Sequence, residues 1–534
     1  MPPAVVYALT PLVGSLLPRE AYIGTEIELK LAVRRGDLSL LTRALEQMAV
    51  PPGASRSKLV STYYDSAERD LAGRKMTLRV RKSGGRYVQT VKSAATNGGS
   101  MLGRGEWEDE VAGECPDLQA PRTGGLVPPE IGDRLEPVFS TKVVRLAVPL
   151  APAPATRIEA AIDRGDIRAA GDGAAERISE VELELVEGPP SALYDVALQL
   201  LEIAPVRLEP RSKSERGYRL ATGLGAAEAV HFGGVASDRG ESGEAVLQAV
   251  GRACLAQLLG SERAALAGEA KGVHQMRVAL RRLRAVLAAF GVLIPKDRRE
   301  PLDGELQWLT KSLGPARAYD VLAADIIEPA KAAKLDRAAL GRLGKAAERR
   351  RRTAYAAART AIRSPRYTAL LLRMMRWFDG REWRDELGAL PDDRLGWPVG
   401  ELAPVLLDRR RRKARKRGKG FAGQSPERRH KLRIALKKLR YTSELFAGLY
   451  DGAAAGGFIR ELKRLQDKLG EANDLQTGRM LIRELTVSRS AAMTRVARQL
   501  LGRRARRVAN AEPKLRGYLK ELYGSPRFWR APAA

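Results

Sequence analysis

Two stretches of this chain carry the same arrangement of a histidine followed by basic residues. The first begins at His274, the second begins 156 positions later at His430, and in both the bases follow three, seven and ten positions on. On an α-helix, residues at these spacings fall within one narrow arc, beside a stripe of leucines. Two such helices facing one another would form a cationic groove suited to a long anion. The residues predicted to hold this anion are His274, Arg277, Arg281, Arg284, His430, Arg433, Lys437 and Arg440.

A row of bases on a helix is ordinarily a solvent-exposed face. Here the duplication, and the position beside the leucine stripe, favour a shared groove, because solvated charge normally lies opposite the core. Metal binding by His274 and His430 is the weaker alternative, since few cysteines or carboxylates stand near them at zinc-ligand spacing. We therefore expect both histidines to be pH-sensitive phosphate contacts rather than catalysts.

Charge is distributed unequally along the chain of 534 residues, whose formal net charge is +30. Residues up to Gly240 sum to about −2 and the remainder to about +32, so a polyanionic partner is expected for the second part alone. The two cysteines, Cys115 and Cys254, exclude a disulfide framework and indicate a reducing compartment. No run approaches the roughly 20 apolar residues that span a bilayer. We expect a cytoplasmic protein without a membrane segment.

Upstream of Gly240, charged and apolar residues alternate in several short segments, among them Glu26–Lys30, Leu78–Arg81 and Glu180–Leu185. A period of two is typical of β-strands. An ordinary antiparallel sheet with a charged outer face would explain it. The alternative that we favour is a closed antiparallel barrel whose charged face lines a tunnel. Acids on one wall and bases on the other fit a metal-bound polyphosphate, because carboxylates hold divalent cations while bases bind phosphate oxygens.

The order of these strands resembles that of a known family. Glu26-Ile-Glu28-Leu-Lys30 matches the ExExK signature of CYTH domains, the triphosphate tunnel metalloenzymes, and a late Glu-x-Glu-x-Glu strand also matches. The resemblance implies catalytic roles for Glu26, Glu28 and Lys30. The implied ligands of Mg²⁺ or Mn²⁺ are Glu26, Glu28, Glu180, Glu182 and Glu184. The implied triphosphate contacts are Lys30, Arg56, Lys58, Arg79, Arg81, Lys92, Arg145 and Lys213.

The activity implied by this resemblance is metal-assisted hydrolysis of inorganic triphosphate. The family also contains thiamine triphosphatases and adenylate cyclases, so thiamine triphosphate and ATP stay open as substrates. A different class of function also stays open, namely a scaffold that binds polyphosphate or polyphosphate granules without turnover.

The second part resembles the CHAD domain, an all-helical module often found behind CYTH. The matching segments are Val273–Arg284, Leu313–Asp320 and His430–Tyr441, although Ala318 stands where the family commonly has an aspartate. The family is associated with inorganic polyphosphate, which the resemblance implies as the partner. Nucleic acid is disfavoured because aromatic residues, which stack on bases, make up only 5% of the chain.

The predicted fold is α+β multidomain, with an N-terminal closed antiparallel β-barrel and flanking helices followed by an all-α duplicated helical bundle. The expected boundaries are a flexible lead-in over 1–21, the CYTH-like domain over 22–222, a linker over 223–240, the CHAD-like domain over 241–525 and a tail over 526–534. Within the helical domain we expect two repeats, at about 241–380 and 400–525. The sequence makes no prediction of oligomeric state.

Overall fold

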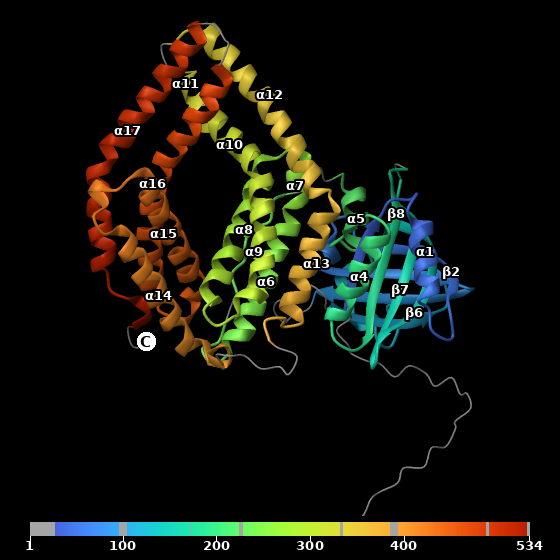
Figure 1. The fold of residues 1–534 in the computed structure, drawn as a ribbon. Coiled ribbons are helices and arrows are strands. Elements are labelled where there is room, and N and C mark those ends of the chain that lie inside the picture. Colours follow the sequence, from blue (N-terminus) through green and yellow to red (C-terminus); the bar gives the residue numbers. More distant parts are fainter. Residues whose placement is uncertain are drawn as a thin grey trace, which may run out of the picture.

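The computed structural model of the chain describes residues 27–94, 104–171, 173–223, 228–235, 237–331, 335–384, 393–486 and 491–530. A strand-rich N-terminal part precedes an all-helical part (Figure 1), which confirms the predicted α+β multidomain class. Within the described ranges, no helix is long and apolar enough to cross a membrane.

The N-terminal part is built on one antiparallel sheet in the order β5-β4-β3-β2-β6-β7-β8-β1-β9. Its strands are β1 (Glu28–Val33), β2 (Ser55–Asp65), β3 (Met76–Ser83), β4 (Arg86–Ala94), β5 (Arg104–Val111), β6 (Glu136–Ala153), β7 (Thr156–Ala169), β8 (Ala175–Glu187) and β9 (Val206–Leu208). The predicted closed barrel is an open sheet over the described residues, because β5 and β9 are its edges and do not pair with each other. Among the described strands, β9 pairs only with β1, and the helical part lies beside it.

The two faces of the sheet differ in chemistry. Apolar residues such as Leu31 and Leu183 are buried beneath helices α1 (Leu38–Gln47) and α4 (Ser191–Ile203). The residues that alternate with them along each strand point to the other face and carry the charges. For example, Lys30 of β1 is the cross-strand partner of Glu182 of β8. Helix α5 (Lys213–Ala221) packs against β6 and β7 and reaches this charged face with its first residue. Two short helices, α2 (Asp70–Gly73) and α3 (Pro129–Gly132), complete this part.

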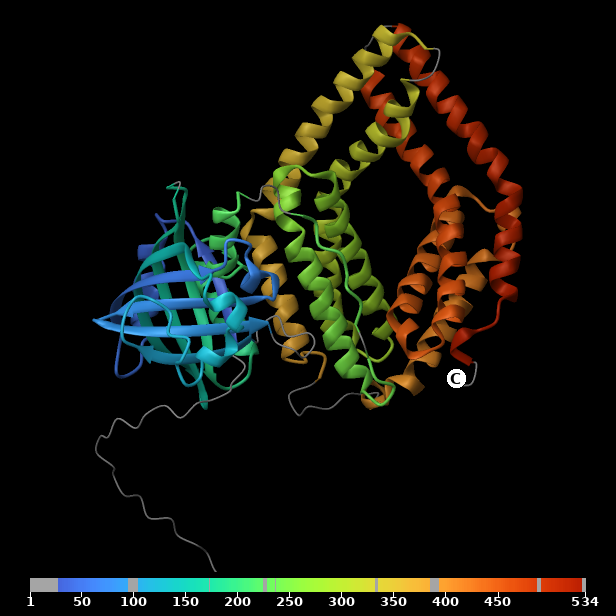
Figure 2. The same cartoon turned by 180° about the vertical axis from the view of Figure 1, so that it is seen from behind.

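The helical part repeats itself at the spacing seen in the sequence. Its helices are α6 (Gly243–Gly260), α7 (Glu262–Ala267), α8 (Ala270–Phe290), α9 (Lys296–Ser312), α10 (Gly314–Leu322), α11 (Glu328–Ala330), α12 (Arg337–Ile362), α13 (Pro365–Asp379), α14 (Val399–Gly418), α15 (Pro426–Phe446), α16 (Gly452–Thr486) and α17 (Ala491–Gly524). Helices α6, α8 and α9 begin 156 positions before α14, α15 and α16, respectively. The two halves form the two sides of a ring of helices (Figures 1 and 2), and α8 contacts α15 between them.

The helical part is docked onto the N-terminal part through α13, which packs against α4 and β9 (Figure 2). The buried Thr368 Oγ1 donates a hydrogen bond to the carbonyl oxygen of Val206 at 3.0 Å. Arg376 Nη1 lies 2.6 Å from Asp195 Oδ1, and Arg207 forms an ion pair with Glu262. Buried apolar residues of both parts belong to one continuous cluster, so the two parts share a core.

Candidate functional site

Three acids lie together on the charged face of the sheet. Asp163 comes from β7, and Glu180 and Glu182 come from the adjacent strand β8, where Glu180 is the cross-strand partner of Asp163. One carboxylate oxygen of each lies within 4.8 Å of the others, a spacing at which they could hold a metal ion. Asp163 is fully buried and Glu180 is 1% exposed. Charged groups at this depth require partners of opposite charge.

Lys213 supplies the central positive charge. Its Nζ lies 2.7 Å from Asp163 Oδ2, 2.5 Å from Glu180 Oε1 and 2.9 Å from Glu182 Oε1. Helix α5 begins at this lysine because Ser212 is its N-cap, accepting a hydrogen bond from the Glu215 amide. Burial lowers the pKa of Lys213, but the three acids outweigh burial and raise that pKa above its usual value.

Two further bases complete the acidic cluster. Arg145 makes a two-pronged contact with Asp163, with Nε at 2.8 Å and Nη2 at 2.7 Å, and its Nη2 also lies 2.5 Å from Glu182 Oε2. Lys30 contacts Glu28 and lies 3.9 Å from Glu182. Burial raises the pKa of Glu182, but the neighbouring bases, led by Lys213, hold that pKa well below its usual range. Glu182 is therefore ionised at neutral pH.

A second group of bases lies on strands β3 and β4, on the same face. Lys92 Nζ is 2.5 Å from Glu106 Oε2, and Arg79 Nη2 is 3.4 Å from Glu106 Oε1. Arg81 Nε donates to Ser61 Oγ at 3.4 Å. The positive charge of Arg79, together with burial, lowers the pKa of Arg81 to about 10. Positive charge is thus in excess at Arg81, as a binding site for phosphate requires.

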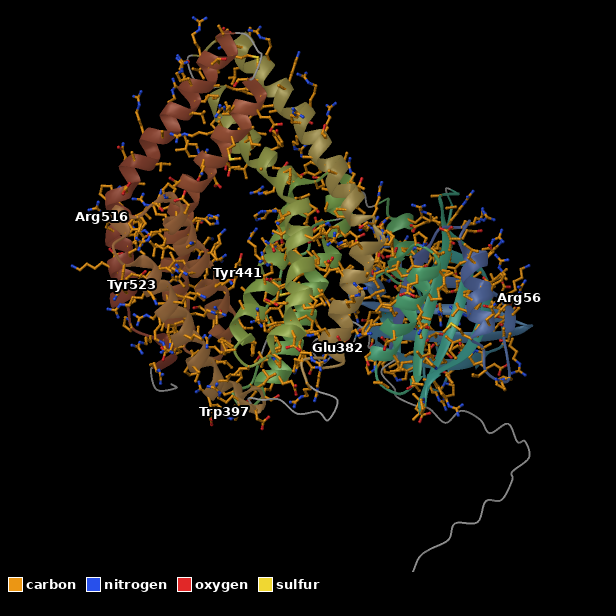
Figure 3. The ribbon with its side chains drawn as sticks, viewed as in Figure 1. Arg56, Glu382, Trp397, Tyr441, Arg516 and Tyr523 are labelled. Atoms are coloured by element: carbon orange, nitrogen blue, oxygen red, sulfur yellow. The ribbon has the colours of Figure 1, made fainter. Side chains whose placement is uncertain are left out.

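Some predicted residues are not part of this arrangement. Ser57 of β2 is the cross-strand partner of Arg145, so its side chain points to the charged face. Its neighbours Arg56 and Lys58 therefore point to the opposite face, where both are exposed. Figure 3 shows Arg56 at the periphery. Glu26 lies outside the described residues. Glu184 is half-buried on the charged face, where it is the cross-strand partner of Glu28.

The sequence interpretation overlooked three residues. Asp163 belongs to the acidic cluster, and Arg216 Nη1 lies 2.7 Å from Glu180 Oε2. Tyr63 is buried beside Arg79 and Arg81, which lower its pKa below the usual value although burial acts in the opposite direction. The alternation of strand β7 was the available signal for Asp163, since it has the same parity as Glu159.

In the helical part, bases of α8 and α15 converge where the two helices approach each other. Arg281 Nε of α8 donates to the hydroxyl oxygen of Tyr441 on α15 at 3.3 Å, and Figure 3 shows Tyr441 between the two halves. Burial, followed by Arg433, Arg281 and Arg440, lowers the pKa of Lys437 to about 7. The structure therefore brings bases of both copies of the sequence motif to one place.

Other members of the motif differ in their surroundings. The buried Nε atoms of Arg277 and Arg433 have no hydrogen-bond partner among the described residues. By contrast, Arg284 contacts Asp303 at 2.8 Å, and Arg440 contacts Gln466 and Glu444.

The two histidines also differ. Burial, followed by Arg317, Arg281 and Arg277, lowers the pKa of His274 to about 4. This histidine is therefore uncharged at neutral pH when no anion is bound. His430 is exposed.

Comparison with known families assigns both parts. The CYTH domain model matches residues 24–218 and the CHAD domain model matches residues 249–483. The chain therefore contains a CYTH domain followed by a CHAD domain, as the sequence motifs predicted.

Individual relatives match parts of the chain. An uncharacterized protein of Mycobacterium tuberculosis is 33% identical over 238 residues, which are 41% of this chain and 41% of that protein. An inorganic triphosphatase of Haemophilus influenzae is 32% identical over 201 residues, or 37% of this chain and 55% of the relative. The chain thus matches about half the length of these curated relatives. The crystal structure of the CHAD domain from the plant Ricinus communis has a TM-score of 0.48 at 25% identity, covering 57% of this chain and 97% of that one.

Proposed function

We propose that the CYTH domain hydrolyses inorganic triphosphate and that the CHAD domain holds polyphosphate. The observation that carries the first half is the pairing of an acidic cluster with a separate group of bases on one face of the sheet. Carboxylates and bases arranged in this way can bind a divalent cation and a chain of phosphates side by side. The relative named inorganic triphosphatase supports the choice of substrate.

The acidic cluster fits a divalent cation of the Mg²⁺ or Mn²⁺ type. Asp163, Glu180 and Glu182 offer only carboxylate oxygens, which these ions prefer. The ammonium group of Lys213 lies 2.5 to 2.9 Å from all three, so the cluster attracts positive charge. Glu28 is the adjacent acid from β1. When bound there, the ion would polarise a phosphate oxygen and favour attack by water.

The bases of the sheet would bind and orient the triphosphate. Arg79, Arg81 and Lys92 form one group, and Arg145 with Lys30 forms another beside the acids. Guanidinium and ammonium groups fixed in this way neutralise the charge that develops on the leaving phosphate. Because transfer to water needs no covalent nucleophile from the protein, positioning and charge would supply the catalysis.

Phosphate release from tripolyphosphate by the full-length protein tests this proposal. We expect turnover only with Mg²⁺ or Mn²⁺, and a loss of about 100-fold or more in Glu182→Gln, which keeps the shape of the side chain and removes its charge. The matched control is Arg56→Gln, on the outer face of β2. Absence of turnover in the wild type with either ion would refute the hydrolase. Equal rates with thiamine triphosphate or ATP would refute inorganic triphosphate as the preferred substrate.

Polyphosphate binding by the helical domain rests on the bases where α8 and α15 meet. The Nε atoms of Arg277 and Arg433 are buried without partners among the described residues, and such donors favour an anion that accepts from them. We expect Arg281→Met to weaken binding of long polyphosphate by about tenfold in EDTA. Tighter binding of single-stranded DNA than of polyphosphate at equal charge and salt would contradict the proposal.

A further inference from the structure

A second group of bases lies between α14 and α15, away from the meeting point of α8 and α15. Arg410 of α14 is 6% exposed and makes no hydrogen bond or ion pair with any residue that the structure describes. Burial, together with Arg409, lowers its pKa to about 10. The guanidinium nitrogens of Arg410 still reach solvent, since they are not among the described side-chain atoms that are buried without a partner, but so little exposure of an arginine without a protein partner is unusual because desolvating its charge is unfavourable.

Lys438 lies on α15, which packs against α14, and its counterpart in the first half, Arg282, contacts the counterpart of Lys413, Gln257. Lys438 is half-buried, and burial followed by Arg410 and Lys413 lowers its pKa below the usual value of a lysine. The acid that acts in the opposite direction is Asp303, which already contacts Arg284 at 2.8 Å. Positive charge is therefore in local excess where helices α8, α14 and α15 meet.

The internal repeat shows which residues the first half has at the same positions. At the spacing of 156, Arg410, Lys413 and Lys438 correspond to Cys254, Gln257 and Arg282 of the first half. There, Cys254 is fully buried and Gln257 is 1% exposed.

The base that remains in the first half is fully engaged. Arg282 Nη1 donates to Gln257 Oε1 at 3.0 Å, and Arg282 Nη2 lies 3.7 Å from Glu444 Oε2. The guanidinium group also lies 3.9 Å from the centre of the Phe232 ring. The first half therefore has a cysteine, a glutamine and one arginine with protein partners at the positions where the second half has three basic residues.

This comparison separates a structural role from a binding role. The helix pair α6 and α8 packs with a thiol and an amide at these positions, so the architecture does not require Arg410 or Lys413. A buried charge without a partner destabilises a fold unless a ligand compensates it. An anion with several acceptor oxygens would satisfy guanidinium and ammonium groups together.

We propose that Arg410, Lys413 and Lys438, with Arg284 at the edge, form a second phosphate-binding site of the helical domain. It would take phosphate groups of an inorganic oligophosphate, either a short anion or one end of a long chain. The inference rests on the proposed polyphosphate binding and adds a site that the duplicated histidine motif does not predict. A nucleic acid is disfavoured because these four lysine and arginine residues include no aromatic side chain on which a nucleobase could stack.

The test replaces the bases by the residues of the first half. In full-length protein with EDTA, we would measure binding of sodium polyphosphate and of pyrophosphate to Arg410→Cys/Lys413→Gln. The matched control is Arg412→Gln/Lys416→Gln, which removes two exposed charges from the same helix. We expect about tenfold weaker binding in the first variant, a change of less than about threefold in the control, and a Tm that is unchanged or raised by about 2–4 °C.

Each alternative result has a distinct meaning. If Arg410→Cys/Lys413→Gln has a lowered Tm, the decisive measurement is the single variant Lys413→Gln, at an exposed position, and unchanged polyphosphate affinity in that variant would overturn the site. Equal losses in the variant and the control would reduce the effect to general charge and also overturn it. Unchanged affinity in both overturns it as well. If the wild type binds no polyphosphate at all, the proposed function fails, and this is distinguishable from failure of the second site alone.

Discussion

Replacing Lys213 by methionine tests whether the acids of the sheet are built for a cation. The change keeps a long apolar side chain and removes the ammonium group that contacts Asp163, Glu180 and Glu182 at 2.5 to 2.9 Å. All three acids are then left with less positive charge, although Arg145 and Arg216 remain nearby. Breaking a buried ion pair by removing one partner costs about 3–5 kcal/mol.

This magnitude predicts a large effect on thermal unfolding. At about 2–4 °C per kcal/mol for a domain of this size, Lys213→Met is expected to lower Tm in EDTA by about 6–20 °C. A divalent cation that binds the acids replaces the missing charge. At a free concentration about 100 times its Kd it restores about 2.7 kcal/mol, so Mg²⁺ or Mn²⁺ should recover much of the loss.

Differential scanning calorimetry of the full-length protein, with EDTA and with each ion, measures both effects. The control is Lys58→Met, since Lys58 is an exposed lysine on the outer face of β2. The reasoning is refuted if Lys213→Met melts at the wild-type temperature in EDTA. It is also refuted if the variant is destabilised and neither ion raises its Tm, because the acids would then need Lys213 and have no affinity for a metal.

Three further predictions follow from single contacts. Gly217→Ala should destabilise the docking of α5 by about 1–3 kcal/mol in urea unfolding, because its Cβ would lie 2.1 Å from Phe139 Cε2; an unchanged midpoint would contradict this packing. Polyphosphate affinity should rise as the pH falls from 8 to 6, because Lys437, with a pKa of about 7, becomes positively charged over this range and attracts the anion. In binding titrations across this pH range, Lys437→Arg should abolish the rise. Arg56→Gln/Lys58→Gln should leave turnover of triphosphate within about twofold of wild type, and a loss of tenfold would place these bases in the site after all.

The sequence predicted local features better than long-range ones. Alternation identified the strands and their charged residues, because the period of a strand is a local property. It could not decide closure, which depends on whether two distant edges such as β5 and β9 meet. It also could not tell which of Arg56 and Lys58 points inward; in the structure neither does, since the register with β6 pairs Ser57 with Arg145.

The helical repeat was easier to find and harder to interpret. The spacing of 156 correctly aligned the helices, because the repeated residues include the leucines that pack in the core of each half. The motif did not show that Arg284 and Arg440 would be engaged by Asp303 and Gln466 while Arg281 stayed at the centre. The differences between the two copies were more informative than the similarities, since Arg410 of the second half stands where the first half has Cys254.

The docking between the two domains affects how the function can be tested. β9 is an edge of the sheet, and the helical domain lies beside it: Thr368 donates to the carbonyl of Val206, and α13 covers α4. β9 pairs with β1, the strand that carries Glu28 and Lys30. Removing the helical domain therefore exposes a sheet edge and part of the shared core next to the proposed site.

A fragment that ends at Gly240 is consequently expected to be less stable than the same domain in the full chain. Lost turnover in that fragment would have two explanations, namely a damaged sheet or the loss of polyphosphate binding. Point variants separate them, because Arg281→Met changes the helical site without touching α13 or β9. If polyphosphate held by the helical domain supplies substrate to the sheet, Arg281→Met should slow turnover of long chains and leave that of triphosphate unchanged. If both substrates slow together and Tm is unchanged, the two sites are coupled through the shared core instead.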